Sequence, residues 1–173
     1  DLVVPHQRQL PYDLFKDFET VCRISVHSIV LAVPASSPYM TLADLVKAAK
    51  AKGNMTAAVS TKGASVDITF LLFGKAAGIK VTTIPGSGGS SAITNLVGGH
   101  VDFGGGHPSE VLPHIKAGRL RALAVALEQR DGSIPEVPTF REAGYDVVTA
   151  GSVKGVAVPA GTPKEVVTYL EAK

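Results

Sequence analysis

The chain has no tryptophan and only one cysteine, Cys22. A single cysteine excludes an internal disulfide bond, and no local signature marks a reactive thiol, so Cys22 is interpreted as a small core residue. Charge is also scarce and nearly balanced, because 17 Lys and Arg stand against 15 Asp and Glu, for a net charge of +2. Without a basic run or clustered aromatic residues, the sequence predicts no nucleic-acid partner.

Long apolar runs are missing as well. The segment 25–34 is interrupted by His27 and Ser28, and no stretch reaches the length of a membrane span. The 173 residues are 45% hydrophobic, which predicts a globular chain of one domain or two small lobes. The chain begins at Asp1 without Met or a signal peptide and stops at Lys173 inside a helix-like pattern, so we interpret it as a fragment or a processed chain.

What the sequence does contain is an alternation of β-rich runs and helical patterns. Short loops separate them, which is typical of an α/β fold with a mostly parallel sheet flanked by helices. The predicted strands are 20–24, 28–33, 56–59, 81–84, 101–103, 120–126 and 156–158. The predicted helices are 42–52, 66–77, 90–97, 109–116, 139–144 and a last one after Pro163.

Local signals mark the ends of two of these helices. Thr41 and Asp44 form a Thr-x-x-Asp pattern close to a capping box, and Gly53 ends the helix that begins there. Gly78 ends the helix at 66–77. Because that helix is apolar nearly all round, the pattern predicts burial between two layers.

Three predicted strands are followed by a Gly- and Ser-rich loop at which a helix begins, at 60–65, 86–91 and 104–109. The first N–H groups of a helix have no partner within the helix, and its dipole adds partial positive charge, so such junctions bind anions. In an open α/β sheet these loops share one edge. The sequence therefore predicts a site for a small carboxylate or phosphate; ordinary turn and capping residues are the alternative interpretation.

Two acidic residues lie near these loops. Asp102 is predicted at a strand end, where it either faces a ligand and orients loop amides or is an ordinary surface or capping residue. Glu110 falls in the first turn of a helix, where a carboxylate complements the dipole, and is interpreted as structural.

Other chemistries fit less well. Gly86 and Gly88 match the start of a dinucleotide-binding fingerprint, but Ser91 stands where the third glycine belongs. His107 and His114 lie two helical turns apart, about 10 Å, which is too far to chelate one ion. The sequence thus predicts no metal and no cofactor. Because no Gly-x-Ser-x-Gly motif and no acid–base pair is evident, it predicts a binding protein without catalytic residues rather than an enzyme.

Several ordered motifs together carry a family resemblance. They are STKGAS at 60–65, LFGKAAGI at 72–79, TIPGSGGSSA at 83–92, LVGGHVD at 96–102, LPHIKAGRLRALAV at 112–125, PEVPT at 135–139, EAG at 142–144 and PAGTP at 159–163. From about Tyr12 to its end, the chain resembles the solute-binding receptors of tripartite tricarboxylate transporters, also called Bug receptors.

The resemblance implies a two-lobed periplasmic receptor with a fold like that of type II periplasmic binding proteins. Residues 1–35 and 149–173 would belong to a partial first lobe, and 36–148 to a nearly complete second lobe. The implied ligand is a small carboxylate, either a di- or tricarboxylate or an aromatic acid, and the implied partner is the membrane permease. A ligand-sensing domain of a transcription regulator is the alternative, and an enzyme on the same fold is a third. A truncated chain is also expected to form a homodimer.

The resemblance also implies which residues contact the ligand, all in the second lobe. They are Ser60, Thr61, Gly63, Ala64, Ser65, Gly86, Ser87, Gly88, Gly89, Ser90, Asp102 and Gly105.

Overall fold

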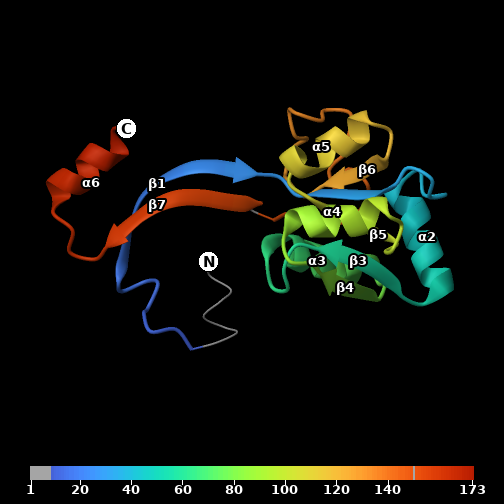
Figure 1. Cartoon of the computed structure of the whole chain (residues 1–173), viewed down its shortest axis with the longest axis horizontal. Coiled ribbons are helices and arrows are strands. Elements are labelled where there is room, and N and C mark those ends of the chain that lie inside the picture. The colour runs from blue at the N-terminus through green and yellow to red at the C-terminus, as the bar shows by residue number, and fades with distance from the viewer. Residues whose placement is uncertain (1–8, 150) are drawn as a thin grey trace. The chain divides into compact units, whose positions relative to one another are not determined.

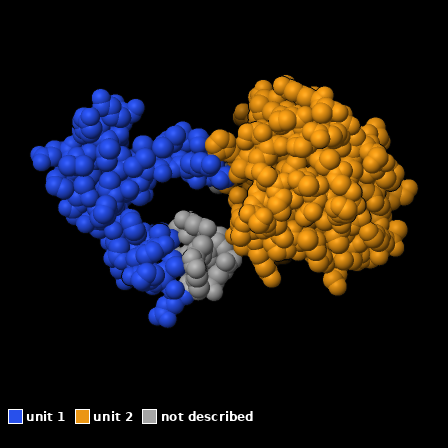
Figure 2. Space-filling view, in the orientation of Figure 1, with its two compact units in different colours: residues 1–26, 152–173 blue, residues 27–151 orange. Residues whose placement is uncertain are grey.

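The computed structural model describes residues 9–149 and 151–173 (Figure 1). Contacts divide the chain into unit 1, Asp1–Val26 with Ser152–Lys173, and unit 2, His27–Gly151 (Figure 2). These bounds differ from the predicted ones because strand β2, Val30–Pro34, pairs with strands of unit 2. Residues 1–8 of the predicted first segment lie outside the described residues.

A mixed sheet forms the centre of unit 2. Its described strands, in the order β4-β3-β5-β2-β6, are β2, β3 (Met55–Val59), β4 (Val81–Pro85), β5 (Phe103–Gly106) and β6 (Leu120–Val125). Strand β3 is parallel to β4 and β5, whereas β2 is antiparallel to both β5 and β6. Strands β3 to β6 therefore run in one direction, as the predicted mostly parallel sheet requires, and β2 runs in the other. Every residue of β2 is buried, because strands lie on both of its sides and helices cover both faces of the sheet.

Helices cover both faces of this sheet. The helices are α2 (Leu42–Lys52), α3 (Ser65–Ala77), α4 (Gly89–Val97) and α5 (Pro108–Lys116). One buried cluster joins α2 and α3 to the sheet and includes Phe70, Phe73 and Phe103. A second cluster joins α4 and α5 to the sheet through residues such as Leu96 and Val111. Each face of the sheet thus has its own buried core. Packing against these cores holds the helices, and with them the loops at which the helices begin.

The predicted helix ends are confirmed. The hydroxyl of Thr41 accepts the N–H of Asp44, whose carboxylate accepts the N–H of Thr41, so the capping box is complete. Gly53 and Gly78 end α2 and α3 in the left-handed conformation that glycine favours. The predicted all-round burial of α3 is wrong, because Leu71 and Leu72 remain 47% and 42% exposed.

The three consecutive glycines 104–106 are not a loop. They are buried and belong to β5, which begins at Phe103 rather than ending there. A Cβ atom on Gly105 would lie 1.8 Å from the carbonyl oxygen of Val30, and one on Gly104 would lie 3.1 Å from Ala58. The glycines therefore permit a close approach of neighbouring strands, and they resemble a turn only in composition.

Residues 139–144 form turns instead of the predicted helix. The backbone N–H of Ala143 donates to the carbonyl of Thr139, and that of Gly144 donates to Arg141. No helix in the described part of the chain has the length and apolar character that crossing a bilayer requires.

Unit 1 is a two-stranded ribbon followed by a helix. Strand β1, Phe18–His27, pairs with β7, Ser152–Pro159, and α6 spans Lys164–Glu171. Both strands are longer than predicted. Cys22 lies on β1 and is only partly buried, so the predicted core position is wrong. None of the residues of α6 is buried within the described structure.

Candidate functional site

The candidate site is the edge of the unit 2 sheet at which β3, β4, β5 and β6 end. Because these four strands run in one direction, the loops that follow them emerge at one edge. The antiparallel strand β2 begins at that same edge, so Ser28 and Ile29 lie there too. The sheet topology therefore brings together the two predicted loops and the segments after β5 and β6.

The first loop, residues 60–64, precedes α3. Its N-cap residue, Ala64, provides no side-chain hydrogen bond in the described structure. Instead, the backbone N–H of Gly63 donates to Oδ2 of Asp67 at 2.6 Å. Gly63 has a φ of +77°, a conformation that glycine adopts without strain. The predicted site residues of this loop are therefore together, and Asp67 is an addition that no sequence signal singled out.

The second loop, residues 86–88, precedes α4. Its N-cap residue Gly88 forms no side-chain hydrogen bond in the described structure, and the described first turn has no acidic residue. The N–H of Ser87 donates to the hydroxyl of Ser91 at 3.3 Å. The N–H groups of Gly89, Ser90 and Ser91 precede the first intrahelical bond, which runs from Ala92 to Gly88. The structure thus places this loop at the start of a helix, as the sequence predicted, and its binding of an anion stays a prediction.

Glu110 links the starts of α5 and α4. Its Oε2 accepts the backbone N–H of His107 at 2.9 Å, which closes a capping box at the first turn of α5. Its Oε1 lies so near Gly89 that an added Cβ there would be 1.8 Å away. Glu110 has the structural position that its first-turn place predicted, and it explains why residue 89 is a glycine.

A polar cluster of distant residues lies beside these loops. The hydroxyl of Ser28 donates to the carboxylate of Asp131, and Nδ1 of His107 lies 3.2 Å from the carbonyl oxygen of Ser28. The rings of His27 and His107 are 5.6 Å apart. Burial raises the pKa of Asp131, but hydrogen bonds from Ser133 and Ser28 outweigh it and lower that pKa overall. No sequence signal identified this cluster, because Ser28 and Asp131 are 103 positions apart.

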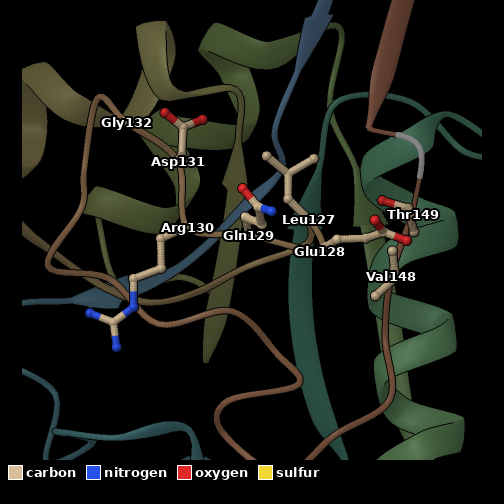
Figure 3. Close-up of a pocket in the computed structure, with 8 residues that line it drawn as sticks. All are labelled: Leu127, Glu128, Gln129, Arg130, Asp131, Gly132, Val148 and Thr149. Atoms are coloured by element: carbon tan, nitrogen blue, oxygen red, sulfur yellow. The ribbon is translucent and has the colours of Figure 1, made fainter.

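The segment after β6 borders a hollow of about 710 Å³. That volume lies within the range of small-molecule pockets. In Figure 3 the Glu128 side chain extends toward Val148 and Thr149, whereas Arg130 points away from them. Arg130 is held there by Glu142 and by the carbonyl of Pro135. The lining residues are Leu127, Glu128, Gln129, Arg130, Asp131, Gly132, Val148 and Thr149.

Two predicted contact residues, Asp102 and Gly105, have surroundings that the sequence did not predict. Asp102 precedes β5 and therefore lies at the opposite edge of the sheet, where its carboxylate binds Lys52 at 2.6 Å and Thr56 at 2.8 Å. Burial raises its pKa, but Lys52 and Thr56 outweigh this effect and lower the pKa overall. Gly105 is buried inside β5 against Val30. Asp102 was misplaced because the predicted strand ended at Phe103, where β5 in fact begins. Gly105 is the residue before the last of β5, and its contact with a ligand stays a prediction.

Among residues 9–149 and 151–173, no three His, Cys, Asp or Glu side chains are grouped so that they could hold a metal ion.

An α/β unit with ligand-accessible loops at the carboxyl edge of its sheet is the architecture of a periplasmic binding protein lobe, and solved structures of such proteins share it. The family follows from the sequence match. The model of the tripartite tricarboxylate transporter family receptor matches residues 2–173, and the chain belongs to this family.

Individual relatives agree with this assignment. The chain is 34% identical over 170 residues to the UPF0065 protein in the tcbD-tcbE intergenic region of Pseudomonas sp. (strain P51), covering 95% of this chain and 50% of the relative. It matches the solved structure of R. palustris Rpa4515 with adipate at a TM-score of 0.83 and 30% identity, covering 94% of this chain and 55% of that one. It matches MatC (Rpa3494) from Rhodopseudomonas palustris with bound malate at a TM-score of 0.82 and 28% identity, covering 95% and 56%. The chain spans about half the length of the curated relatives it matches.

Proposed function

We propose that this chain is part of a periplasmic receptor that binds a small carboxylate and delivers it to the membrane permease of a tripartite tricarboxylate transporter. Unit 2 is one lobe of this receptor, and unit 1 belongs to the other. The observation that carries the proposal is the start of α4, where the first N–H groups have no side-chain cap and no acidic residue of their own first turn in the described structure. Glu110 of α5 lies against Gly89 there, so the N–H groups of Ser90 and Ser91 are the proposed ligand contacts. Ser60, Thr61, Gly63, Ala64 and Ser65 of the first loop complete the wall of the site.

The relatives support a carboxylate ligand. Rpa4515 was solved with adipate and MatC with bound malate, and both compounds are dicarboxylates. The lining of the hollow after β6 mixes apolar and polar side chains, which suits a short carbon chain with polar ends.

A receptor rather than an enzyme fits the polar cluster at this edge. The Ser28 hydroxyl donates to Asp131, whereas His107 meets the backbone carbonyl of Ser28. In the Ser–His arrangement of a nucleophilic serine, the histidine accepts the serine O–H. Here that hydroxyl donates to a carboxylate whose lowered pKa makes it a weak base, and the histidine meets the backbone carbonyl. The family match over residues 2–173 favours the receptor over the regulator alternative.

The proposed mechanism is ligand-driven closure of two lobes. A carboxylate held by the α4 N–H groups also contacts the other lobe, to which unit 1 belongs, once the lobes close, and contacts made only in the closed state shift the population toward it. The closed, loaded form is the species that the permease would recognise.

The test is a binding screen of the full-length protein against adipate, malate and hexanoate, with phosphate and ATP as non-carboxylate comparisons. Ser90→Asp adds a carboxylate to the first turn of α4, where it suits the helix dipole but fills the anion position. Ser90→Asn is the uncharged match of nearly equal size. We expect calorimetry to show carboxylate affinity at least about tenfold lower in Ser90→Asp than in Ser90→Asn. Binding of ATP but of no carboxylate would refute the proposal.

A further inference from the structure

The segments that form the candidate site carry little positive charge for a site that binds an anion. They are residues 27–29, 60–65, 86–91, 106–110 and 127–133, all of which the structure describes. Their acidic residues are Glu110, Glu128 and Asp131, whereas Lys62 and Arg130 are their only Lys or Arg. Lys62 is exposed, and Arg130 is engaged in an ion pair with a glutamate outside these segments. A bound carboxylate would therefore meet an excess of negative charge unless a histidine became protonated.

His107 is the residue that follows the central strand β5 at this edge. Its backbone N–H donates to Oε2 of Glu110 at 2.9 Å, and Oε1 of the same carboxylate lies against Gly89. His107 and the start of α4 thus contact one carboxylate and are neighbours. A ligand carboxylate at the N–H groups of Ser90 and Ser91 would lie near His107 and would be repelled by Glu110.

The ring of His107 has one engaged nitrogen and one open nitrogen. Nδ1 lies 3.2 Å from the carbonyl oxygen of Ser28, and since a carbonyl only accepts, Nδ1 carries the proton of this hydrogen bond. The N–H of Glu110 donates to the backbone carbonyl of His107 and leaves Nδ1 to Ser28. Within residues 9–149 and 151–173, Nε2 has no hydrogen bond and is not buried, so a ligand can reach it. Nε2 of the neutral ring is an acceptor, whereas Nε2 of the protonated ring donates to a carboxylate.

The elements packed against α5 bring no other charge to His107. Helix α5 packs on α4, β2, β5 and β6. Helix α4 and strands β2 and β5 have no titratable side chain. Strand β6 has one, Arg121, and its guanidinium donates to the carbonyl of Ala35 at the opposite edge of the sheet. On α5 itself, Glu110 lies in the first turn, and His114 and Lys116 lie in the last.

Two titratable groups face His107 from the segments beside α5. The ring centre of His27 lies 5.6 Å from that of His107, and Asp131 interacts electrostatically with His27. Two imidazolium ions at this distance repel each other, so one positive charge is favoured over two. Asp131 offsets a charge on His27, whereas Glu110 and the ligand carboxylate offset a charge on His107.

We infer that His107 is a ligand-contact residue of the proposed site and binds the ligand carboxylate through Nε2 as an imidazolium. The ring takes one proton from solvent as the carboxylate binds, and this positive charge also offsets the field of Glu110. The inference rests on the proposed function and adds to it a binding residue and a coupling to protons. Affinity is therefore full below the pKa of the free histidine, ordinarily about 6.5, and is lost as the pH rises above it.

The test measures the carboxylate affinity of the full-length protein at pH 6 and pH 8 by calorimetry. The probe is whichever of adipate, malate and hexanoate binds most tightly. A histidine of ordinary pKa is mostly protonated at pH 6 and almost wholly neutral at pH 8, so we expect at least about fivefold higher affinity at pH 6. Titrations at pH 7 in two buffers of different ionisation enthalpy should show uptake of about 0.5–1 proton per bound ligand.

His107→Asn separates a ligand contact from a structural role. Its amide still donates to the carbonyl of Ser28, but it has no charge and no group at the position of Nε2. We expect its affinity at pH 6 to be at least about fivefold lower than that of the natural protein, and to differ by less than about twofold between pH 6 and pH 8. His107→Gln, whose uncharged amide reaches the position of Nε2, is the second variant and should also lose the pH dependence.

The matched control is His100→Asn. His100 is an exposed histidine between α4 and β5, at the edge of the sheet opposite the ligand loops, so its variant should keep the pH dependence of the natural protein. Equal affinities of the natural protein at pH 6 and pH 8, or a pH dependence that persists in both His107 variants, would overturn the inference and leave the proposed function standing. If the natural protein binds none of the three carboxylates at either pH, the proposed function fails and the inference fails with it.

Discussion

The carboxylate of Asp102 accepts two hydrogen bonds from Thr56, one from its backbone nitrogen at 2.8 Å and one from its hydroxyl at 2.9 Å. In return, the backbone N–H of Asp102 donates to the carbonyl of Thr56 at 3.1 Å. These bonds tie the residue before β5 to the start of β3, so they set the register of two parallel strands. Asp102 therefore stabilises the sheet from the edge that is opposite the ligand loops.

Replacing Asp102 is expected to cost stability rather than ligand affinity. Asp102→Ala leaves the Thr56 N–H without its acceptor, and we expect the free energy of unfolding to fall by about 2–3 kcal/mol. Carboxylate affinity should stay within about twofold. Urea unfolding and calorimetry measure the two quantities. Lys52→Met removes only a half-exposed ion-pair partner and should cost less than about 1 kcal/mol. If Asp102→Ala instead lost carboxylate binding while its stability stayed unchanged, Asp102 would belong to the ligand site.

The lowered pKa of Asp102 predicts a pH dependence of stability. Burial raises this pKa, but the ammonium of Lys52 and the donors of Thr56 outweigh burial and lower it below the ordinary value. A lowered pKa stabilises the folded state above the unfolded pKa of about 3.9, and that stability is lost as the pH falls through the folded pKa. We expect the free energy of unfolding to drop below about pH 4, and to drop less in Asp102→Asn. Equal slopes in both proteins would contradict this.

Gly105 is expected to tolerate no side chain. A Cβ atom at this position would lie 1.8 Å from the carbonyl oxygen of Val30, in the middle of a buried sheet. Gly105→Ala should therefore lower the free energy of unfolding by at least about 3 kcal/mol, because one of the two strands must move. Gly132→Ala, where nothing lies within 4 Å, should change it by less than about 0.5 kcal/mol. Equal stabilities of the two variants, measured by urea unfolding, would exclude the close approach.

Arg121 is expected to hold the connection between β2 and α2. Its guanidinium donates to the backbone carbonyls of Ala35 and Tyr39 at 3.1 and 3.0 Å. Arg121→Met leaves these part-buried acceptors without the guanidinium and should lower the free energy of unfolding by about 1–2 kcal/mol. Cleavage by a protease at residues 35–40 should also become faster. Arg119→Met, a change at an exposed side chain, is the control and should alter neither property.

Local chemistry made part of this fold predictable. Thr41, Asp44, Gly53 and Gly78 act within one helical turn of the ends that they define, so the sequence alone locates those ends. The glycines of β5 failed as a signal because their role depends on Val30, a residue about 75 positions away that the sequence does not show beside them. The glycine-rich composition indicated a loop, whereas these glycines are needed because two strands approach each other closely.

The candidate site, like the fold, was predictable only where the signal is local in the sequence. Both ligand loops follow directly from a strand-to-helix junction, and the structure places them at one edge. Asp67 was not found because its importance comes from burial, and Ser28 and Asp131 were not found because their contact joins distant parts of the chain. The misplacement of Asp102 follows from a shift of β5 by a few residues, since a strand has two ends and only one of them meets the ligand loops.

The central position of β2 has a consequence for synthesis. This strand precedes the other strands of unit 2 in the chain, and the strands on its two sides, β5 and β6, are made roughly 70 and 90 residues later. The nascent chain therefore carries an apolar strand with two unpaired edges through most of the translation of unit 2. Pairings that are so distant in sequence form slowly. A binding partner that shields β2 during this interval, or slow release of the nascent chain, would raise the yield of folded protein.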